Sequence, residues 1–179
     1  MMPAGGAGWG DCWAVPRWQG GERREKTLSR IDRSALIARP VEQVFDLINE
    51  VEAYPRLFDW CRSASVVDRS ADQLTARLAI EYAGFHSAFT TRNLIERPSS
   101  IELCLLEGPF SRLRGRWSLQ ALGDSGCRVD LMLDFEFAGR LFGSALALGF
   151  QGLADRMVSE FARAARSAPL TPLGGAVAP

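Results

Sequence analysis

The sequence is poor in the residues that most metal and hydrolytic sites need. It has one histidine, His86, and its four cysteines contain no CxxC pair. Zinc knuckles and dithiol redox centres use such closely spaced pairs, and a Ser-His-Asp triad would depend on this one histidine. These classes of enzyme and metal protein are therefore disfavoured, and we expect the four cysteines to be reduced, mostly buried thiols.

Long apolar runs and an excess of one charge are also missing. No stretch reaches about 18 uninterrupted apolar residues, which excludes a membrane-spanning helix. The start of the chain lacks the basic and continuous apolar segments of a secretory signal, so we expect a cytoplasmic protein. The 21 basic residues equal the 21 acidic ones. This balance argues against a general nucleic-acid binder, and we expect no DNA partner.

The length and composition indicate one folded domain. The chain has 179 residues, 47% of them hydrophobic, which is enough for a single core. Residues 1–26 hold six glycines and show no periodicity, so they are interpreted as a flexible leader. Residues 168–179 contain three prolines and two glycines and are interpreted as a flexible tail. The predicted domain is therefore residues 27–167.

The first part of this domain combines a strand with short helices. A strand is predicted over 28–37, and Pro40 then occupies a position that favours the start of a helix. The apolar residues that follow have the spacing of one helical face: Val41, Val44, Phe45 and Ile48. The next segment, VEAYPRLFDWC, is too aromatic for a solvated loop. We expect it to cover an apolar surface.

From residue 64 to residue 138 the hydrophobic pattern has period two. Turn residues interrupt it at 68–72, 84, 98–100, 108–109 and 123–126, which predicts six consecutive strands. The last strand is the clearest, because its odd-numbered residues from Val129 to Phe137 are apolar. Most of its even-numbered residues are charged, so we expect an antiparallel sheet with one solvated face.

The pattern changes to helical spacing between residues 139 and 166. Apolar residues recur at steps of three or four, from Phe142 to Phe161, along about 27 residues or about 40 Å. Three glycines, Gly143, Gly149 and Gly152, interrupt this helix, and something must need their small size. The predicted fold is α+β, with a curved antiparallel sheet around a long C-terminal helix.

Four segments together closely resemble one branch of a known superfamily. They are VEAYPRLFDWCRSASVV, EGPFSRLRGRW, VDLMLDFEF and MVSEFARAA. Residues 28–167 resemble the coenzyme-Q-binding and ribosome-association-toxin branch of the START-like, helix-grip superfamily, which is similar in fold to polyketide cyclases. The resemblance implies a lipophilic cavity between the sheet and the long helix, although fold alone does not identify what is bound.

The resemblance also carries over to individual residues. Tyr54, Pro55, Phe58, Trp60 and Cys61 match the lid segment of that branch. Gly108, Pro109 and Phe110 match its Gly-Pro-Phe turn, and Trp117 matches its strand tryptophan. The predicted ligand-binding residues are Tyr54, Pro55, Phe58, Trp60, Tyr82, Phe89, Phe110, Trp117, Phe135, Leu146, Phe150 and Leu153.

A solid core is the alternative to a cavity for so many apolar residues. The glycines in the long helix favour a cavity, because they remove volume where a packed core needs it, and we expect Gly149 and Gly152 near the cavity wall. We expect the cavity to have a volume of a few hundred Å³. A polyprenyl quinone such as ubiquinone, or a similar lipid, suits such a site. Its head needs only one or two hydrogen bonds, which Tyr82, Tyr54, Thr91 or Asn93 can supply. No cofactor or metal is predicted.

The function predicted first is therefore a non-enzymatic carrier or chaperone of ubiquinone that supports respiration, with transient contact to the inner membrane. Catalysis is disfavoured, because the acidic side chains of the last strand are predicted to point away from the apolar face. The second hypothesis is a toxin that binds the large ribosomal subunit and blocks subunit association. Arg112, Arg114 and Arg116 are its candidate RNA-facing residues. We expect these arginines instead to pair across strands with Asp134 and Glu136.

Overall fold

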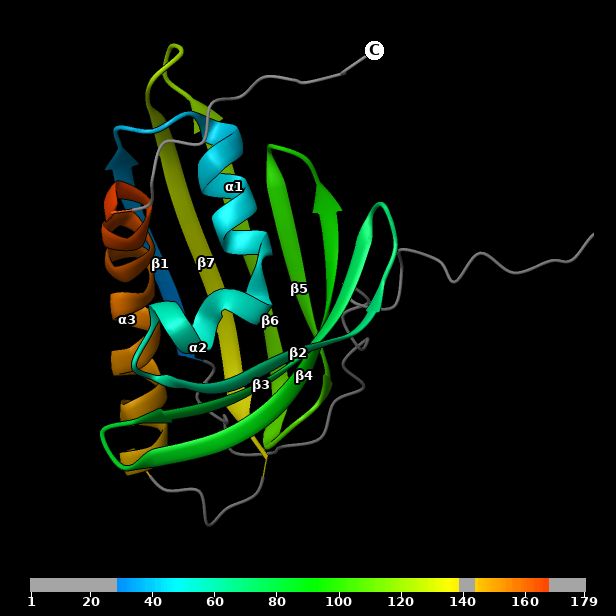
Figure 1. Ribbon diagram of the computed structural model, residues 1–179. Helices are drawn as coiled ribbons and strands as arrows, with labels where there is room; N and C mark the ends of the chain where they lie inside the picture. Colours follow the sequence, from blue (N-terminus) through cyan, green and yellow to red (C-terminus); the bar gives the residue numbers. More distant parts are fainter. Residues whose placement is uncertain (1–28, 139–143, 168–179) are drawn as a thin grey trace, which may run out of the picture.

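Seven antiparallel strands form one curved sheet in the computed structural model, which describes residues 29–138 and 144–167 (Figure 1). The spatial order of the strands is β1-β7-β6-β5-β4-β3-β2. In chain order the elements are β1 (Ser29–Ile37), α1 (Val41–Asn49), the 3-10 helix η1 (Val51–Ala53), α2 (Tyr54–Leu57), β2 (Cys61–Arg69), β3 (Gln73–Tyr82), β4 (Phe85–Glu96), β5 (Ser100–Glu107), β6 (Phe110–Ala121), β7 (Cys127–Phe137) and α3 (Ser144–Ser167). The predicted α+β helix-grip fold is confirmed.

The long helix α3 lies across the opening of the curved sheet. Figure 1 shows α3 beside β1 at one edge, while β2, β3 and β4 curve round towards its first half. An ion pair of 2.5 Å between Arg33 Nη2 on β1 and Asp155 Oδ1 joins the helix to this edge. Part of the concave face is therefore enclosed between the sheet and the helix.

The strands β2 to β7 are the six that the period-two pattern predicts. In β7 the side chains of Val129, Leu131 and Phe135 are at most 1% exposed, whereas those of the even-numbered Arg128 and Met132 are exposed. This alternation places one face of the sheet in the core and the other at the surface. The helix α1 also buries the predicted face, with Val44 and Phe45 almost fully inside.

The pairing of β6 with β7 sets the positions of the arginines on the outer face. Arg114 lies opposite Asp134 and Arg112 lies opposite Glu136. Arg114 Nη2 is 2.9 Å from Asp134 Oδ2, which confirms the expected cross-strand pair. Arg116 Nη1 pairs instead with Glu102 on the other neighbouring strand, at 3.2 Å. These arginines therefore do not form a ridge of uncompensated positive charge.

Two of the cysteines behave as expected and one does not. Cys61 and Cys127 are free and buried. Burial raises the pKa of the Cys61 thiol to about 11, so it stays protonated at neutral pH. Cys104 is bonded in a disulfide, so the expectation that all four thiols are reduced is wrong.

Some predictions fall outside the residues that the structure describes. They concern the leader of residues 1–26, the tail of residues 168–179 and the first residues of the long helix, including Gly143. Within the described ranges, no helix is long and apolar enough to cross a membrane.

Candidate functional site

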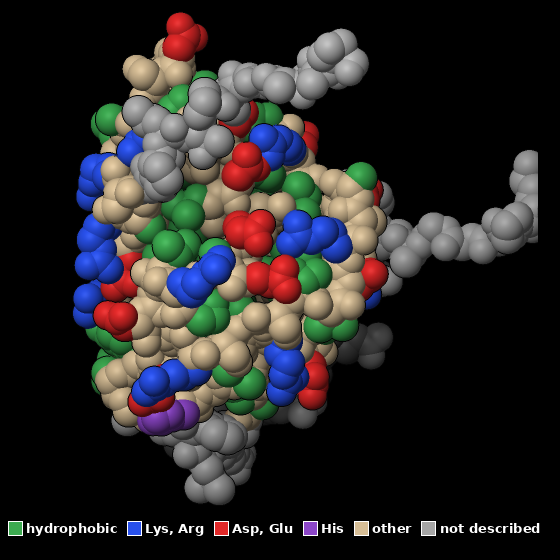
Figure 2. Space-filling model, viewed as in Figure 1, with side chains coloured by type: hydrophobic (Ala, Val, Ile, Leu, Met, Phe, Trp, Pro, Cys, Tyr) green, Lys and Arg blue, Asp and Glu red, His purple; other side chains and the backbone are tan. Residues whose placement is uncertain are grey.

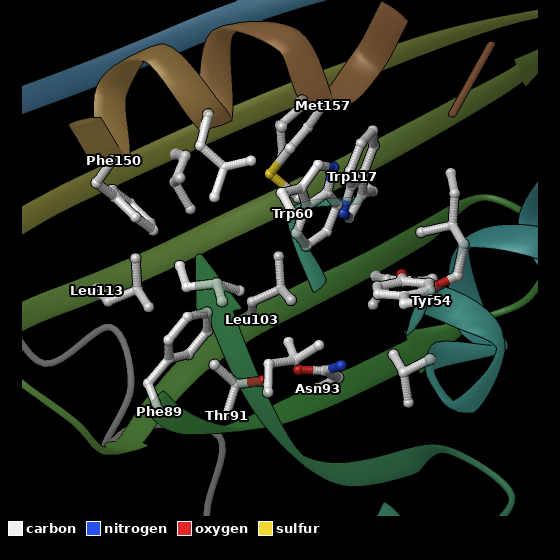
Figure 3. A pocket seen from close by; sticks show the side chains of 18 residues that line it. Tyr54, Trp60, Phe89, Thr91, Asn93, Leu103, Leu113, Trp117, Phe150 and Met157 are labelled. Carbon is white, nitrogen blue, oxygen red and sulfur yellow. The ribbon is translucent and has the colours of Figure 1, made fainter. Parts of the chain in front are cut away.

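A cavity of about 70 Å³ lies between the concave face of the sheet and α3 (Figure 3). The sheet contributes aliphatic side chains such as Leu103, Leu113 and Leu133, and α3 contributes Phe150 and Met157. Every lining side chain is aliphatic or aromatic except those of Thr91 and Asn93. The site is thus an apolar chamber with one polar position on its wall.

The short helices form the aromatic end of the chamber. Tyr54, at the start of α2, is buried, and its hydroxyl donates a hydrogen bond of 2.5 Å to the backbone oxygen of Ile48. Phe58 stacks on Trp60 with ring centroids 5.1 Å apart and ring planes 9° apart. Burial, with a smaller contribution from Cys61, raises the pKa of the Tyr54 hydroxyl far above its usual value. The predicted role of this segment as an apolar cover fits its burial.

Two polar contacts close the side of the chamber between α3 and the β2–β3 edge. Trp60 Nε1 donates a hydrogen bond of 2.6 Å to Glu160 Oε2 on α3. Four residues earlier on the helix, Arg156 Nη1 donates to the Tyr82 hydroxyl at 3.1 Å, and its guanidinium lies over the Tyr82 ring. We call Trp60, Tyr82, Arg156 and Glu160 the side latch. It holds α3 against the strands that curve towards it.

Thr91 and Asn93 are the two polar side chains that face the chamber from β4. In Figure 3 they lie side by side, in a row with Phe89. They are only 2% and 4% exposed, and neither Thr91 Oγ1 nor Asn93 Oδ1 has a hydrogen-bond partner. Most buried polar atoms in proteins are hydrogen-bonded, so two such atoms beside one cavity need an explanation.

The Gly-Pro-Phe turn positions another wall of the chamber. Gly108 has φ of +153°, and a Cβ atom there would lie 2.7 Å from Phe89 Cβ. Only glycine fits so close to the neighbouring strand. The turn then places Phe110 edge-on to Phe89, with ring centroids 5.7 Å apart. Phe110 thus packs behind Phe89 rather than lining the cavity.

Six of the twelve predicted ligand-binding residues line the cavity. They are Tyr54, Trp60, Phe89, Trp117, Phe150 and Leu153. Five others do not line it: Pro55, Phe58, Tyr82, Phe110 and Phe135. The side chain of Leu146 lies outside the described part of the structure. Binding of a ligand by any of the twelve stays a prediction.

Two geometric expectations about the chamber are wrong. Its volume is about 70 Å³ rather than a few hundred, because leucines, aromatic rings and Met157 fill the span between sheet and helix. Gly152 is not part of the lining. A Cβ atom there would lie 3.3 Å from Cε1 of Tyr82, so this glycine makes room for the tyrosine of the side latch.

Other lining residues were not among the predicted ones. They come mainly from the inward-facing positions of the strands and from α1 and η1: Ile48, Val51, Leu78, Ile80, Ile101, Leu103, Leu113, Leu131 and Leu133, together with Met157 of α3. In the strands, the alternation of apolar and polar residues predicts which side chains point inward. It does not predict which of them line a cavity and which pack in a solid core.

The chamber lacks the usual groups for acid–base chemistry. None of its lining residues is a histidine, cysteine, aspartate or glutamate. His86 lies outside it, 64% exposed, with Nδ1 3.6 Å from Glu81 Oε2. In the described residues, no cluster of His, Cys, Asp and Glu is suited to bind a metal ion. The geometry suits binding of an apolar molecule.

Comparison with known proteins agrees with this geometry. Residues 37–162 match the family described as polyketide cyclase / dehydrase and lipid transport. The chain belongs to this family. Among its relatives, the ribosome association toxin RatA of Pseudomonas aeruginosa is 37% identical over 77% of this chain and 96% of its own length. The mitochondrial coenzyme Q-binding protein of Schizosaccharomyces pombe is 25% identical over 78% of this chain and 90% of its own.

Solved structures of other proteins share the same architecture. The Zhui aromatase/cyclase of a Streptomyces species superimposes with a TM-score of 0.69 at 16% identity. The match covers 78% of this chain and 94% of that one. At this identity the likeness shows the fold alone. The predicted START-like resemblance is confirmed.

Proposed function

We propose that the protein binds one lipophilic molecule of the polyprenyl quinone class, such as ubiquinone, in the chamber and acts as its carrier. The observation that carries this proposal is the chamber itself, which is lined by aliphatic and aromatic side chains except at Thr91 and Asn93. The family description includes lipid transport, and one relative is named a coenzyme Q-binding protein. Both names support a lipophilic ligand.

The size of the chamber implies that it widens when the ligand binds. Pockets for ligands of this kind have volumes of about 300–1,000 Å³, whereas this cavity has about 70 Å³. Three lining residues, Phe150, Leu153 and Met157, lie on α3. Movement of α3 away from the sheet would enlarge the chamber, and the flexible Met157 can repack around a guest. Such opening suits a transient contact with a membrane surface, where an apolar tail can transfer.

Burial of the tail supplies the driving force. Apolar area removed from water contributes about 25 cal/mol per Å², and part of this is offset by the cost of ordering the tail. A binding role also fits the absence of acid–base groups in the lining. We therefore propose a carrier and not a cyclase.

Mass spectrometry of an organic extract tests this proposal. The full-length protein, purified from a bacterium that makes ubiquinone, should release substoichiometric ubiquinone, whereas a Phe150→Asp variant should release none. Folded wild-type protein that carries no quinone, and takes up none when ubiquinone is added, would contradict the proposal.

Ribosome association is the second candidate function. It is favoured by the 37% identity to a relative named a ribosome association toxin. In Figure 2, acidic and basic side chains are interspersed over the middle of the face, while basic side chains are more frequent along its left edge. Arg114 and Arg116 of the outer face are paired with carboxylates.

The test of ribosome association is co-sedimentation of the protein with purified large ribosomal subunits. Co-sedimentation by protein that neither retains nor takes up quinone would make this candidate the better account.

A further inference from the structure

We propose that Thr91 and Asn93 form the polar end of the ligand site and select a ligand whose head is uncharged and carries oxygen. This assignment rests on the proposed function and names the chemistry of the head that the chamber accepts. Both side chains are more than nine-tenths buried and face the cavity, with an oxygen that has no partner in the protein.

The strand register explains why no protein group satisfies these two oxygens. Across β3 and β5, Asn93 lies opposite Leu74 and Leu103. Thr91 lies opposite Ala76 and Leu105. All four neighbours are apolar, so the cross-strand positions offer no side-chain donor or acceptor. Because both residues line the cavity and neither oxygen has a partner in the protein, a ligand in the cavity can supply one.

The polar groups of two other lining residues, Tyr54 and Trp60, are already engaged. The Tyr54 hydroxyl donates to the backbone oxygen of Ile48, and Trp60 Nε1 donates to Glu160. Tyr82, another candidate from the sequence, does not line the chamber and receives a hydrogen bond from Arg156. Of the four side chains that the sequence suggested for the head of the ligand, Thr91 and Asn93 are the ones with unused capacity.

The charge of the lining restricts the head further. The cavity wall contains no lysine, arginine or histidine. A carboxylate or phosphate placed there would be buried without a counter-ion, which is strongly unfavourable. A hydrocarbon without oxygen would leave the two side-chain oxygens unpaired. A carbonyl or hydroxyl group suits them, because the threonine hydroxyl can donate to a carbonyl and the asparagine amide can donate or accept.

The adjacent residue on β4 provides a matched control. Thr90 points to the opposite face, where its Oγ1 accepts a hydrogen bond of 3.5 Å from Arg77 Nη1. Thr90 and Thr91 are both buried, so Thr90→Val and Thr91→Val make the same chemical change on the two faces of one strand. Only Thr91→Val alters the chamber.

The experiment compares three probes that carry the same ten-carbon saturated tail. One has the ubiquinone head, one ends in a carboxylate and one ends in a phenyl ring. Affinities for the full-length protein are measured by calorimetry at neutral pH, and circular dichroism verifies the fold of each variant. We expect the wild-type protein to bind the quinone at least about tenfold more tightly than either other probe, a difference of about 1.4 kcal/mol.

Thr91→Val and Asn93→Leu should each weaken quinone binding about tenfold and leave binding of the phenyl probe unchanged, and Thr90→Val should change neither. Equal quinone affinity in the wild-type, Thr91→Val and Asn93→Leu proteins would overturn this assignment alone. Tight binding of the carboxylate probe would also overturn it. If the wild-type protein binds none of the three probes, the proposed function fails, and the assignment fails with it.

Discussion

Asp134 on the outer face of the sheet and Thr91 and Asn93 on the inner face are all buried, but they differ in how their oxygens are satisfied. On the outer face, Asp134 is only 4% exposed and accepts hydrogen bonds from two arginines. Arg30 Nε and Arg114 Nη2 each lie 2.9 Å from one of its carboxylate oxygens. On the inner face, Thr91 and Asn93 are equally buried, yet Oγ1 and Oδ1 have no partner.

The difference distinguishes a polar group that stabilises the fold, Asp134, from the two that we propose bind a ligand, Thr91 and Asn93. Burial by itself would raise the pKa of Asp134, but the hydrogen bonds and charges of Arg30 and Arg114 outweigh it and lower that pKa. The outer carboxylate is therefore stabilised by the fold itself. The inner oxygens are stabilised by nothing in the protein, which is expected of a site that a guest completes.

The largest loss of stability is expected when a carboxylate is placed on the inner face of the sheet. Phe150 is 4% exposed and lines the chamber, so Phe150→Asp creates a buried charge that has no arginine beside it. We expect the free energy of unfolding at pH 7 to fall by about 3–5 kcal/mol in urea denaturation. The pKa of the new carboxyl should be raised by burial, so the loss should shrink as the pH falls from that raised pKa to the unfolded-state value of about 3.9, and should change no further below it.

Phe150→Leu is the control for this substitution, because it keeps an apolar side chain and should cost only about 1 kcal/mol. If Phe150→Asp is no more destabilising than Phe150→Leu, the chamber is open to water and the contrast between the two faces disappears.

Removal of the charge of Asp134 tests the outer face. Asp134→Asn should lower the free energy of unfolding by about 1–3 kcal/mol at pH 7, because the arginine hydrogen bonds weaken. The pKa of Asp134 is lowered in the folded protein, so its contribution is present above the unfolded-state value of about 3.9. The contribution is lost as the pH falls through the folded pKa. Urea denaturation of both proteins from pH 7 to pH 2 measures this.

Asp130→Asn is the matched control on the same strand. Asp130 is half-buried and pairs with Arg128, two residues before it, which is half exposed. This substitution should cost less than about 1 kcal/mol. Equal losses for the two variants would show that burial between two arginines adds nothing at Asp134.

Loss of a side-latch contact should destabilise the protein less than loss of the charge of Asp134. Glu160→Ala removes the acceptor of the Trp60 indole hydrogen bond and the ion pair with Arg156. We expect a loss of about 1 kcal/mol and faster release of bound quinone, measured by stopped-flow fluorescence. Glu160→Gln retains an acceptor and should release quinone at a rate closer to wild type. Unchanged release in both variants would mean that the latch does not control access to the chamber.

The architecture was predictable because it depends on periodicity. Period-two alternation in strands such as β7, and the three- and four-residue steps of α3, each report which side of an element is apolar. Keeping both apolar faces inside across one short turn placed Arg114 opposite Asp134 or Glu136, and the structure has it opposite Asp134. These predictions of apolar faces and strand pairing use only the spacing of residues along the chain, so they require no knowledge of how side chains pack.

The volume of the chamber and its exact lining residues were harder to predict from the sequence. Gly152 was expected at the cavity wall, but it packs on Tyr82, a residue 70 positions earlier in the chain. Phe135 has the correct parity, yet it packs against Phe110 and Phe150 instead of lining the cavity. How side chains fill the space between sheet and helix depends on rotamers and on distant partners, and periodicity encodes neither.

The stability of Thr91→Val without ligand tests the central claim most directly, because it requires no knowledge of the guest. If Thr91 Oγ1 is buried and unpaired, replacing the hydroxyl with a methyl group should leave the free energy of unfolding unchanged or raise it by up to about 1 kcal/mol. Thr90→Val on the outer face should lower it, since its hydroxyl accepts from Arg77. A loss of about 1 kcal/mol or more for Thr91→Val would show that its hydroxyl is satisfied within the protein, and it would contradict the account.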